Sequence, residues 1–279
     1  MISLFGAGGI RLAASAWGDP AAPPVVFLPG GGQTRHAWAA AGQAVAAAGF
    51  RAVSVDLRGH GDSDWAADGD YAHATVAADL VVLSRSFAGP PAVVGASLGG
   101  VAALLAVGEM GLPARALVLV DIVPRSERAG VRRVVTFLAG NQGGFDSLEE
   151  AAAAVQGYKP ERPVDVERLR QHLRRGADGR WRWHWDPRLM AHQGRHSREI
   201  PERMAAASTG VTVPTLLVRG RKSDMVSDEG VAEFRALIPE AEFVDIADAA
   251  HMVSGDHNDA FAAAVVEFLT RTASVAGTR

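Results

Sequence analysis

One serine stands in a setting that would make it a nucleophile. Ser97 is the centre of a G-A-S-L-G motif at residues 95–99, directly after the apolar run 92–94 and directly before a helical pattern. A sharp turn from strand to helix exposes a serine hydroxyl, and only very small neighbours fit around such a turn. A lone G-x-S-x-G also occurs by chance in glycine-rich turns. Because a predicted strand precedes this motif and a predicted helix follows it, we predict that Ser97 attacks a carbonyl carbon.

A serine nucleophile needs a base that accepts its proton. The sequence holds nine histidines, and His251 is the best placed of them. It follows the apolar run 242–246 through a short loop and precedes the last helical pattern, so that it can fold over Ser97. We expect His251 to be the general base; the alternative is a histidine on a surface loop.

The base in turn needs a carboxylate that fixes its tautomer. Asp224 lies on the loop after the apolar run 213–218, and the order Ser97, Asp224, His251 is that of nucleophile, acid and base. Asp121, at the end of an earlier apolar run, is the rival for the acid. Alternatively, Asp121 caps the segment that follows it or lies at the wall of the pocket.

Two backbone amides are expected to hold the oxyanion of this reaction. Leu98, the residue after the nucleophile, supplies one of them. The glycine-rich loop at residues 30–32 supplies the other, with Gly31 as the expected donor, because glycines let the backbone approach a substrate closely. A phosphate-binding loop is the rival interpretation, but the loop lacks both G-x-G-x-x-G and G-K-[ST].

Three tryptophans, at residues 181, 183 and 185, alternate with Arg182 and His184. In an extended segment this period of two places all three indoles on one face. They would wall a pocket for an apolar or aromatic acyl group or, in the alternative interpretation, hold this segment against the rest of the protein. The expected pocket residues are Gly32, His36, Asp121, Trp181, Trp183 and Trp185.

Short apolar runs rich in β-branched residues alternate with alanine-rich helical patterns along most of the chain. This alternation predicts an α/β fold with a parallel sheet covered by helices on both faces. Strands are expected at residues 10–17, 25–28, 52–55, 92–94, 116–120, 213–218 and 242–246. Helices are expected at residues 38–48, 75–87, 98–107, 228–237 and 259–270.

Residues 124–208 interrupt this alternation. They are polar, rich in arginine and helical in pattern, without the signal of a buried strand. We therefore expect an inserted cap at residues 124–208, and a core domain formed by residues 1–123 and 209–279.

Composition excludes several other classes of function. The chain has 279 residues, no cysteine and a formal net charge of −3. It therefore has no disulfide, no thiolate nucleophile and no cysteine-ligated metal, and it lacks the charge that nucleic acid or an anionic membrane would attract. Residues 86–108 are uncharged, but their prolines and glycines argue against a membrane span. We expect no metal, no cofactor, no nucleic-acid or membrane partner and, without a signal-peptide pattern, a cytoplasmic location.

The chain resembles the α/β-hydrolase superfamily over nearly its whole length. The resemblance implies a mostly parallel sheet of the eight-stranded type, helices on both faces and a mainly helical cap inserted after the sixth strand, where residues 124–208 fall. Four motifs match in order: L-P-G-G at residues 28–31, D-L-R-G-H-G-D-S at residues 56–63, G-A-S-L-G-G at residues 95–100, and the loops that carry Asp224 and His251.

The chain departs from that pattern at the oxyanion loop. Many relatives have His-Gly where this chain has Pro29-Gly30, and their histidine braces the loop. His36 is a candidate to replace it, as a brace or as a pocket group, whereas His60 is expected to be structural. Ser97 also excludes the alkyl-ester chemistry of relatives that carry a carboxylate at this turn, such as haloalkane dehalogenases.

The resemblance implies a serine hydrolase that cleaves a small carboxylic ester, thioester or lactone through an acyl-enzyme. Its expected partner is a small apolar or aromatic carbonyl compound, and its expected state is a monomer or a homodimer. Hydrolysis of a carbon–carbon bond, peracid synthesis and cofactor-free oxygenation are alternatives on the same residues. A non-catalytic ligand receptor is an alternative on the same fold.

Overall fold

The computed structural model describes residues 1–158, 164–189, 199–247 and 259–276. Eight of its strands form one sheet in the order β1-β2-β4-β3-β5-β6-β9-β10. The strands β1, β2 and β4 pair antiparallel, and the strands from β4 to β10 pair in parallel. Their bounds are β1 Ile2–Phe5, β2 Arg11–Trp17, β3 Pro24–Leu28, β4 Arg51–Val55, β5 Ala92–Ala96, β6 Ala116–Val120, β9 Thr215–Gly220 and β10 Glu242–Ile246.

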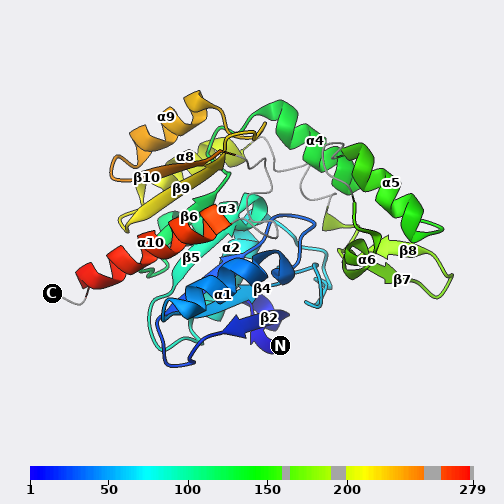
Figure 1. Ribbon diagram of the computed structural model, residues 1–279, viewed down its shortest axis with the longest axis horizontal. Coiled ribbons are helices and arrows are strands. Elements are labelled where there is room, and N and C mark those ends of the chain that lie inside the picture. Colours follow the sequence, from blue (N-terminus) through cyan, green and yellow to red (C-terminus); the bar gives the residue numbers. More distant parts are fainter. Residues whose placement is uncertain (159–163, 190–198, 248–258, 277–279) are drawn as a thin grey trace.

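The central strands are apolar at consecutive positions because helices cover both faces of the sheet. In β3, Val26 and Leu28 face one hydrophobic cluster, whereas Val25 and Phe27 face the other. The first cluster includes residues of α2 His73–Ser84, α3 Ser97–Leu104, the π-helical turn η3 Leu105–Glu109, α8 Ile200–Thr209 and α9 Asp228–Leu237. The second includes residues of α1 Ala39–Ala47 and α10 Asp259–Ala276, which cover the face turned toward the viewer in Figure 1.

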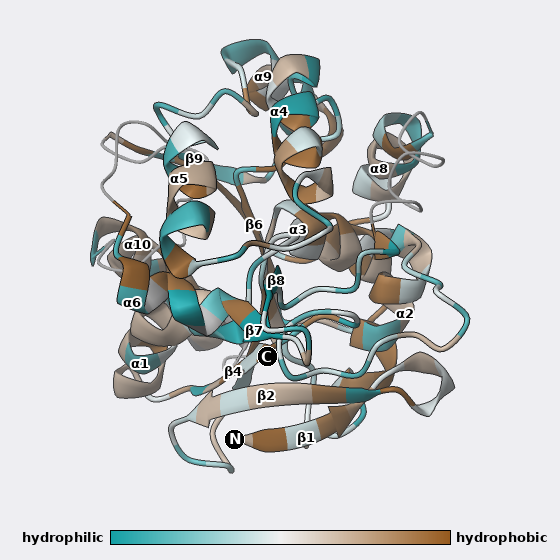
Figure 2. Cartoon of the chain, turned by 90° about the vertical axis from the view of Figure 1, so that its right-hand side faces the viewer, coloured by the Kyte–Doolittle hydropathy of each residue, from teal (hydrophilic) through white to brown (hydrophobic). Residues whose placement is uncertain are grey.

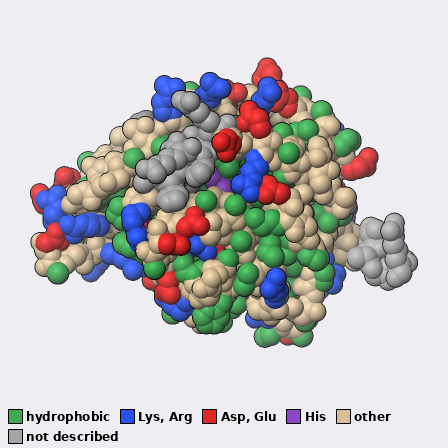
Figure 3. Space-filling view, turned by 180° about the vertical axis from the view of Figure 1, so that it is seen from behind, with side chains coloured by type: hydrophobic (Ala, Val, Ile, Leu, Met, Phe, Trp, Pro, Cys, Tyr) green, Lys and Arg blue, Asp and Glu red, His purple; other side chains and the backbone are tan. Residues whose placement is uncertain are grey.

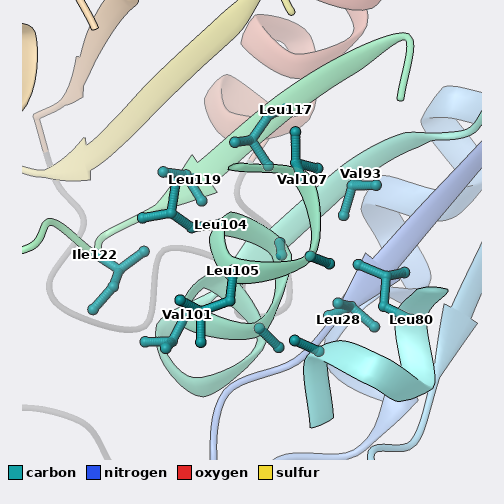
Figure 4. Packing of buried hydrophobic residues seen from close by; sticks show 14 of the residues in the cluster. Leu28, Leu80, Val93, Val101, Leu104, Leu105, Val107, Leu117, Leu119 and Ile122 are labelled. Carbon is teal, nitrogen blue, oxygen red and sulfur yellow. The ribbon is translucent and has the colours of Figure 1, made fainter. Parts of the chain in front are cut away.

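The helix after the predicted nucleophile is buried in the first of these clusters. Figure 4 shows Leu104, the last residue of α3, beside Leu119 of β6. Both side chains are fully buried. Their packing fixes α3 on the sheet, and with it the turn that begins the helix. The α/β-hydrolase fold predicted from the sequence is confirmed.

A cap lies over one end of the sheet (Figure 1). It has its own hydrophobic cluster, which includes Phe145, Trp183 and Trp185 and is joined by Tyr71 of the core domain. Helix α4 is amphipathic, and hydrophobic and hydrophilic stretches alternate along it in Figure 2. The described cap elements are α4 Arg128–Ala139, α5 Leu148–Tyr158, α6 Val166–Leu169, the 3₁₀ turn η4 Arg170–His172, β7 Leu173–Arg175 and β8 Trp181–Trp183.

Helix α8 falls within residues 124–208, the range expected for the cap, but it packs with the helices of the sheet. Its Met204 and Ala207 belong to the first core cluster. A Cβ added to Gly108 would lie only 2.0 Å from the carbonyl oxygen of Ala207, so the two backbones are in close contact. We therefore draw the boundary of the cap before α8.

Short elements complete the described chain. The remaining 3₁₀ turns are η1 Ala7–Gly9 and η2 Arg35–Trp38. No described helix is both long and apolar enough to cross a membrane. On the face drawn in Figure 3, described acidic and basic side chains are interspersed.

Candidate active site

Ser97 lies at the turn between β5 and α3 with a backbone φ of 46°. This left-handed conformation is strained for a serine. A Cβ added to Gly99 would lie 2.4 Å from the carbonyl oxygen of Leu28, and one added to Gly95 would lie 2.5 Å from the carbonyl oxygen of Gly99. The glycines of the motif therefore let the strand, the helix and the loop after β3 meet closely, while Ser97 lines a cavity.

The glycine-rich loop after β3 lies against this turn. A Cβ added to Gly30 would lie 3.4 Å from Ser97 Cβ, and one added to Gly31 would lie 3.7 Å from Leu98 Cδ2. The Gly30 N–H donates to Gln33 Oε1 at 2.9 Å. The N–H groups of Gly31 and Leu98 donate to no acceptor in the described part of the protein. Two neighbouring amides are thus available to hold an oxyanion.

The cavity beside Ser97 has a volume of about 170 Å³ and lies between the sheet and the cap. Trp183 and Trp185 form part of its wall and stack with ring centroids 4.9 Å apart. Among the described residues, none of those that line it is an aspartate, glutamate, lysine or arginine, and no group of three or more His, Asp or Glu is placed to hold a metal ion. The lining residues are Gly30, Gly31, Gly32, Gln33, Ala96, Ser97, Val134, Phe137, Leu138, Val155, Tyr158, Leu169, His172, Trp183 and Trp185.

Only part of the expected pocket set lies at this cavity: Gly32, Trp183 and Trp185. The Trp181 ring instead lies under the guanidinium groups of Arg170 and Arg175, each 5.8 Å from its centroid. His36 lies on η2 and is exposed, whereas Arg35 and Trp38 of the same turn are buried. Asp121 lies at the end of β6, away from the described cavity wall.

Asp121 is a buried carboxylate directly after β6, the strand that pairs with the strand before the serine. It has a left-handed φ of 51°, and only 1% of its surface is exposed. Its Oδ2 accepts a hydrogen bond from Ser223 Oγ at 2.6 Å, and its Oδ1 accepts one from the Gly220 N–H at 3.4 Å. The carboxylate is thus held by the end of β9 and the loop that follows it.

Asp224, expected as the acid, has a different environment. Its side chain is 37% exposed and pairs with Arg133 of helix α4 at 2.7 Å. A Cβ added to Gly130 of the same helix would lie 2.4 Å from the carbonyl oxygen of Asp224. Asp224 therefore joins the loop after β9 to the cap. His251, expected as the base, lies outside the described residues.

Two buried histidines lie behind the glycine-rich loop, with ring centroids 6.0 Å apart. Burial lowers the pKa of His60, against the opposing effects of the Arg58 carbonyl and the Asp56 charge. Burial also lowers the pKa of His184 well below its ordinary value, and repulsion from a charged His60 or His172 adds to this. Both rings are therefore neutral at neutral pH. The conspicuous G-H-G segment marks His60 in the sequence; nothing comparable marks His184.

Known proteins resemble the chain over most of its length. Residues 23–258 match the family model described as the alpha/beta hydrolase fold. The chain is 30% identical over 256 residues to the esterase Rv0045c of Mycobacterium tuberculosis, which covers 88% of this chain and 82% of the esterase. It is 31% identical over 266 residues to a 3-hydroxybutyrate-oligomer hydrolase of Cupriavidus necator, with 88% of each protein covered. Among solved structures, E-2-(acetamidomethylene)succinate hydrolase superimposes with a TM-score of 0.84 at 26% identity, over 96% of this chain and 99% of that one.

Proposed function

The chain belongs to the α/β hydrolase family, and on that premise we propose that it is a serine esterase for small esters with an uncharged, apolar acyl group. It is a hydrolase, and its relatives include named esterases. The observation that carries the proposal is the position of Ser97: it lies on a strained turn, beside the available amides of Gly31 and Leu98, and it lines an apolar cavity.

In the proposed reaction, the Ser97 hydroxyl attacks the ester carbonyl carbon and gives its proton to His251. The carbonyl oxygen becomes an oxyanion, which accepts hydrogen bonds from the N–H groups of Gly31 and Leu98. Collapse of this intermediate breaks the bond to the alkoxy oxygen, which takes the proton from His251 and leaves as an alcohol. A water molecule then attacks the acyl-enzyme with His251 as base again, and the carboxylic acid leaves while Ser97 regains its proton.

We assign the carboxylate that orients His251 to Asp121, in place of Asp224. Burial and two donated hydrogen bonds hold the Asp121 carboxylate in one position, directly after β6, which pairs with β5. Asp224 is more exposed and already engages Arg133. A carboxylate that must fix an imidazole acts best from a buried, preorganised site, which favours Asp121.

The cavity supports the assignment of the substrate class. Its walls are mainly apolar, and its described lining side chains include no lysine or arginine to pair with a carboxylate. Its volume, about 170 Å³, is below the roughly 300–1,000 Å³ of sites for drug-sized ligands. These features favour a short, uncharged acyl group over the dicarboxylate for which the succinate hydrolase is named.

The experiment that tests this function measures hydrolysis of p-nitrophenyl butyrate and of p-nitrophenyl monosuccinate. We expect kcat/KM to be at least 10-fold higher for the butyrate. S97A should abolish turnover, whereas S86A, which changes a serine on the loop before β5 at the opposite end of that strand, should leave it intact. Full activity of S97A would remove Ser97 from the mechanism.

Two further variants test the choice of acid. We expect D121N to lower kcat by about 10⁴-fold, as loss of the orienting carboxylate does in serine proteases. We expect D224N to lower kcat less than 10-fold, because only the ion pair with Arg133 is lost. The reverse ranking would return the role to Asp224. Absence of turnover across a broad ester panel would favour the receptor alternative.

A further inference from the structure

We propose that His184, a residue of the cap, is a positioning residue for the oxyanion loop, so that the amides of this loop are correctly placed only while the cap is seated. This inference rests on the proposed function, because it concerns the loop that supplies the Gly31 amide. It adds a role for the cap beyond that of forming a wall of the pocket.

The hydrogen bonds of His184 define its tautomer. Its Nδ1 lies 2.8 Å from the Gly61 N–H, which can only donate, so this nitrogen must be the acceptor. The proton of the neutral ring is therefore on Nε2, which lies 3.2 Å from the carbonyl oxygen of Gly32. His184 thus donates to the residue next to Gly31.

His60 holds the other side of the same residue. Its Nε2 accepts from the Gly32 N–H at 3.1 Å, and its Nδ1 donates to the Arg58 carbonyl oxygen at 3.0 Å. Two imidazoles of opposite tautomer therefore bind the N–H and the carbonyl group of Gly32. The glycine has a φ of 75°, and an added Cβ would lie 2.4 Å from Leu138 Cδ2. Packing and hydrogen bonds thus leave Gly32 little freedom to move.

His60 belongs to the core domain, but His184 reaches the loop from the cap. The segment that carries it is bound tightly to the core. The Asp186 N–H donates to the Gly59 carbonyl at 2.9 Å, and Tyr71 donates through its hydroxyl to Asp186 Oδ2 at 2.5 Å. Arg188 donates to the Ala66 carbonyl at 2.8 Å. A displacement of this segment would withdraw His184 and release the Gly32 carbonyl.

The expected consequence is a defect in the transition state and not in substrate binding. An oxyanion donor acts only when it is aimed at the developing charge, and loss of one donor lowers kcat by about 10²–10³-fold. Loosening the loop without deleting the donor should therefore lower kcat by about 10–100-fold. The KM should change less than about threefold, because the acyl pocket keeps its wall.

The test compares two substitutions of the same residue. In H184Q the side-chain amide reaches the position of Nε2 and can still donate to Gly32. In H184N the side chain is shorter: its oxygen replaces Nδ1 as the acceptor for Gly61, but nothing reaches Gly32. We expect H184N to lose kcat, and to bind a trifluoromethyl ketone transition-state analogue more weakly by the same factor. We expect H184Q to keep at least a third of both.

Equal losses in both variants, or full kcat and analogue affinity in H184N, would overturn the inference. Turnover by the unaltered protein tests the proposed function separately. Hydrogen exchange in residues 30–33 gives a readout that needs no turnover, and we expect faster exchange in H184N than in H184Q. If H184N does not fold, Y71F loosens the same cap segment from the core side, and an unchanged exchange rate and kcat in that variant would also overturn the inference.

Discussion

Acid should destabilise this protein in a pH range set by its two buried imidazoles. His60 and His184 are neutral in the folded protein, with pKa values lowered by burial, whereas in the unfolded chain each titrates near 6.5. As the pH falls below about 6.5, the unfolded chain therefore binds protons that the folded protein does not. The free energy of unfolding must therefore decrease as the pH falls below about 6.5. Well above this pH, these two histidines should not affect it.

The magnitude follows from this linkage. Between pH 7.5 and 5.5, one histidine that stays neutral when folded costs about 1.4 kcal/mol of stability, and two cost about 2.7 kcal/mol. The groups around His184 reinforce the effect, since His60, His172 and Arg174 all disfavour its charged form. Asp56 acts in the opposite direction on His60, so the value for two histidines is an upper limit.

The assay is urea unfolding of the unaltered protein and of H184Q at pH 7.5, 6.5 and 5.5. The variant lacks one titrating group, so its loss of stability between pH 7.5 and 5.5 should be smaller by about 1.4 kcal/mol. Burial raises the pKa of the Asp186 carboxyl, but hydrogen bonds from Arg188 and Tyr71 outweigh this effect and lower the pKa, so Asp186 titrates below this range. An identical pH dependence in both proteins would refute the argument that His184 is held neutral.

Three further predictions concern packing, charge and specificity. The substitution G99A places a Cβ 2.4 Å from the Leu28 carbonyl oxygen. It should lower the free energy of unfolding, measured by urea titration, by about 1–3 kcal/mol. Unchanged stability would contradict the close packing of this turn. The substitution D79A leaves the guanidinium of Arg58 buried without its carboxylate partner. It should lower the free energy of unfolding by about 3–5 kcal/mol in the same assay. A loss below about 1 kcal/mol would show that stability does not depend on this ion pair. W183L enlarges the apolar cavity and should shift the ratio of kcat/KM values toward octanoate over butyrate esters, whereas an unchanged ratio would exclude Trp183 from acyl recognition.

The sequence was most informative where burial is complete. The strands β3, β5 and β6 are apolar at consecutive positions, and their patterns predict a parallel sheet and, with the glycines of residues 95–99, the turn at Ser97. The strand β1 was missed because it is a four-residue edge strand with one buried residue. The strands β7 and β8 have three residues each and carry arginines, so they lack the apolar run that marks a strand.

The site was predictable only where local geometry determines it. Ser97 and its glycines form a continuous motif, because a strained turn restricts every neighbour. The choice between Asp121 and Asp224 depends on which carboxylate the fold buries, and both follow a strand in the same way. The bonds of His184 to Gly32 and Gly61 join residues more than a hundred positions apart, and no pattern of spacing within one sequence reveals them.

The covalent intermediate is the most direct test of the catalytic account. The protein should be treated with a fluorophosphonate, digested and analysed by mass spectrometry, with S97A as control. We expect one phosphonyl group on the peptide that contains Ser97, loss of ester turnover in proportion to labelling, and no adduct in S97A. Turnover that persists after complete labelling of Ser97, or an adduct on another residue that accounts for inactivation, would contradict the account.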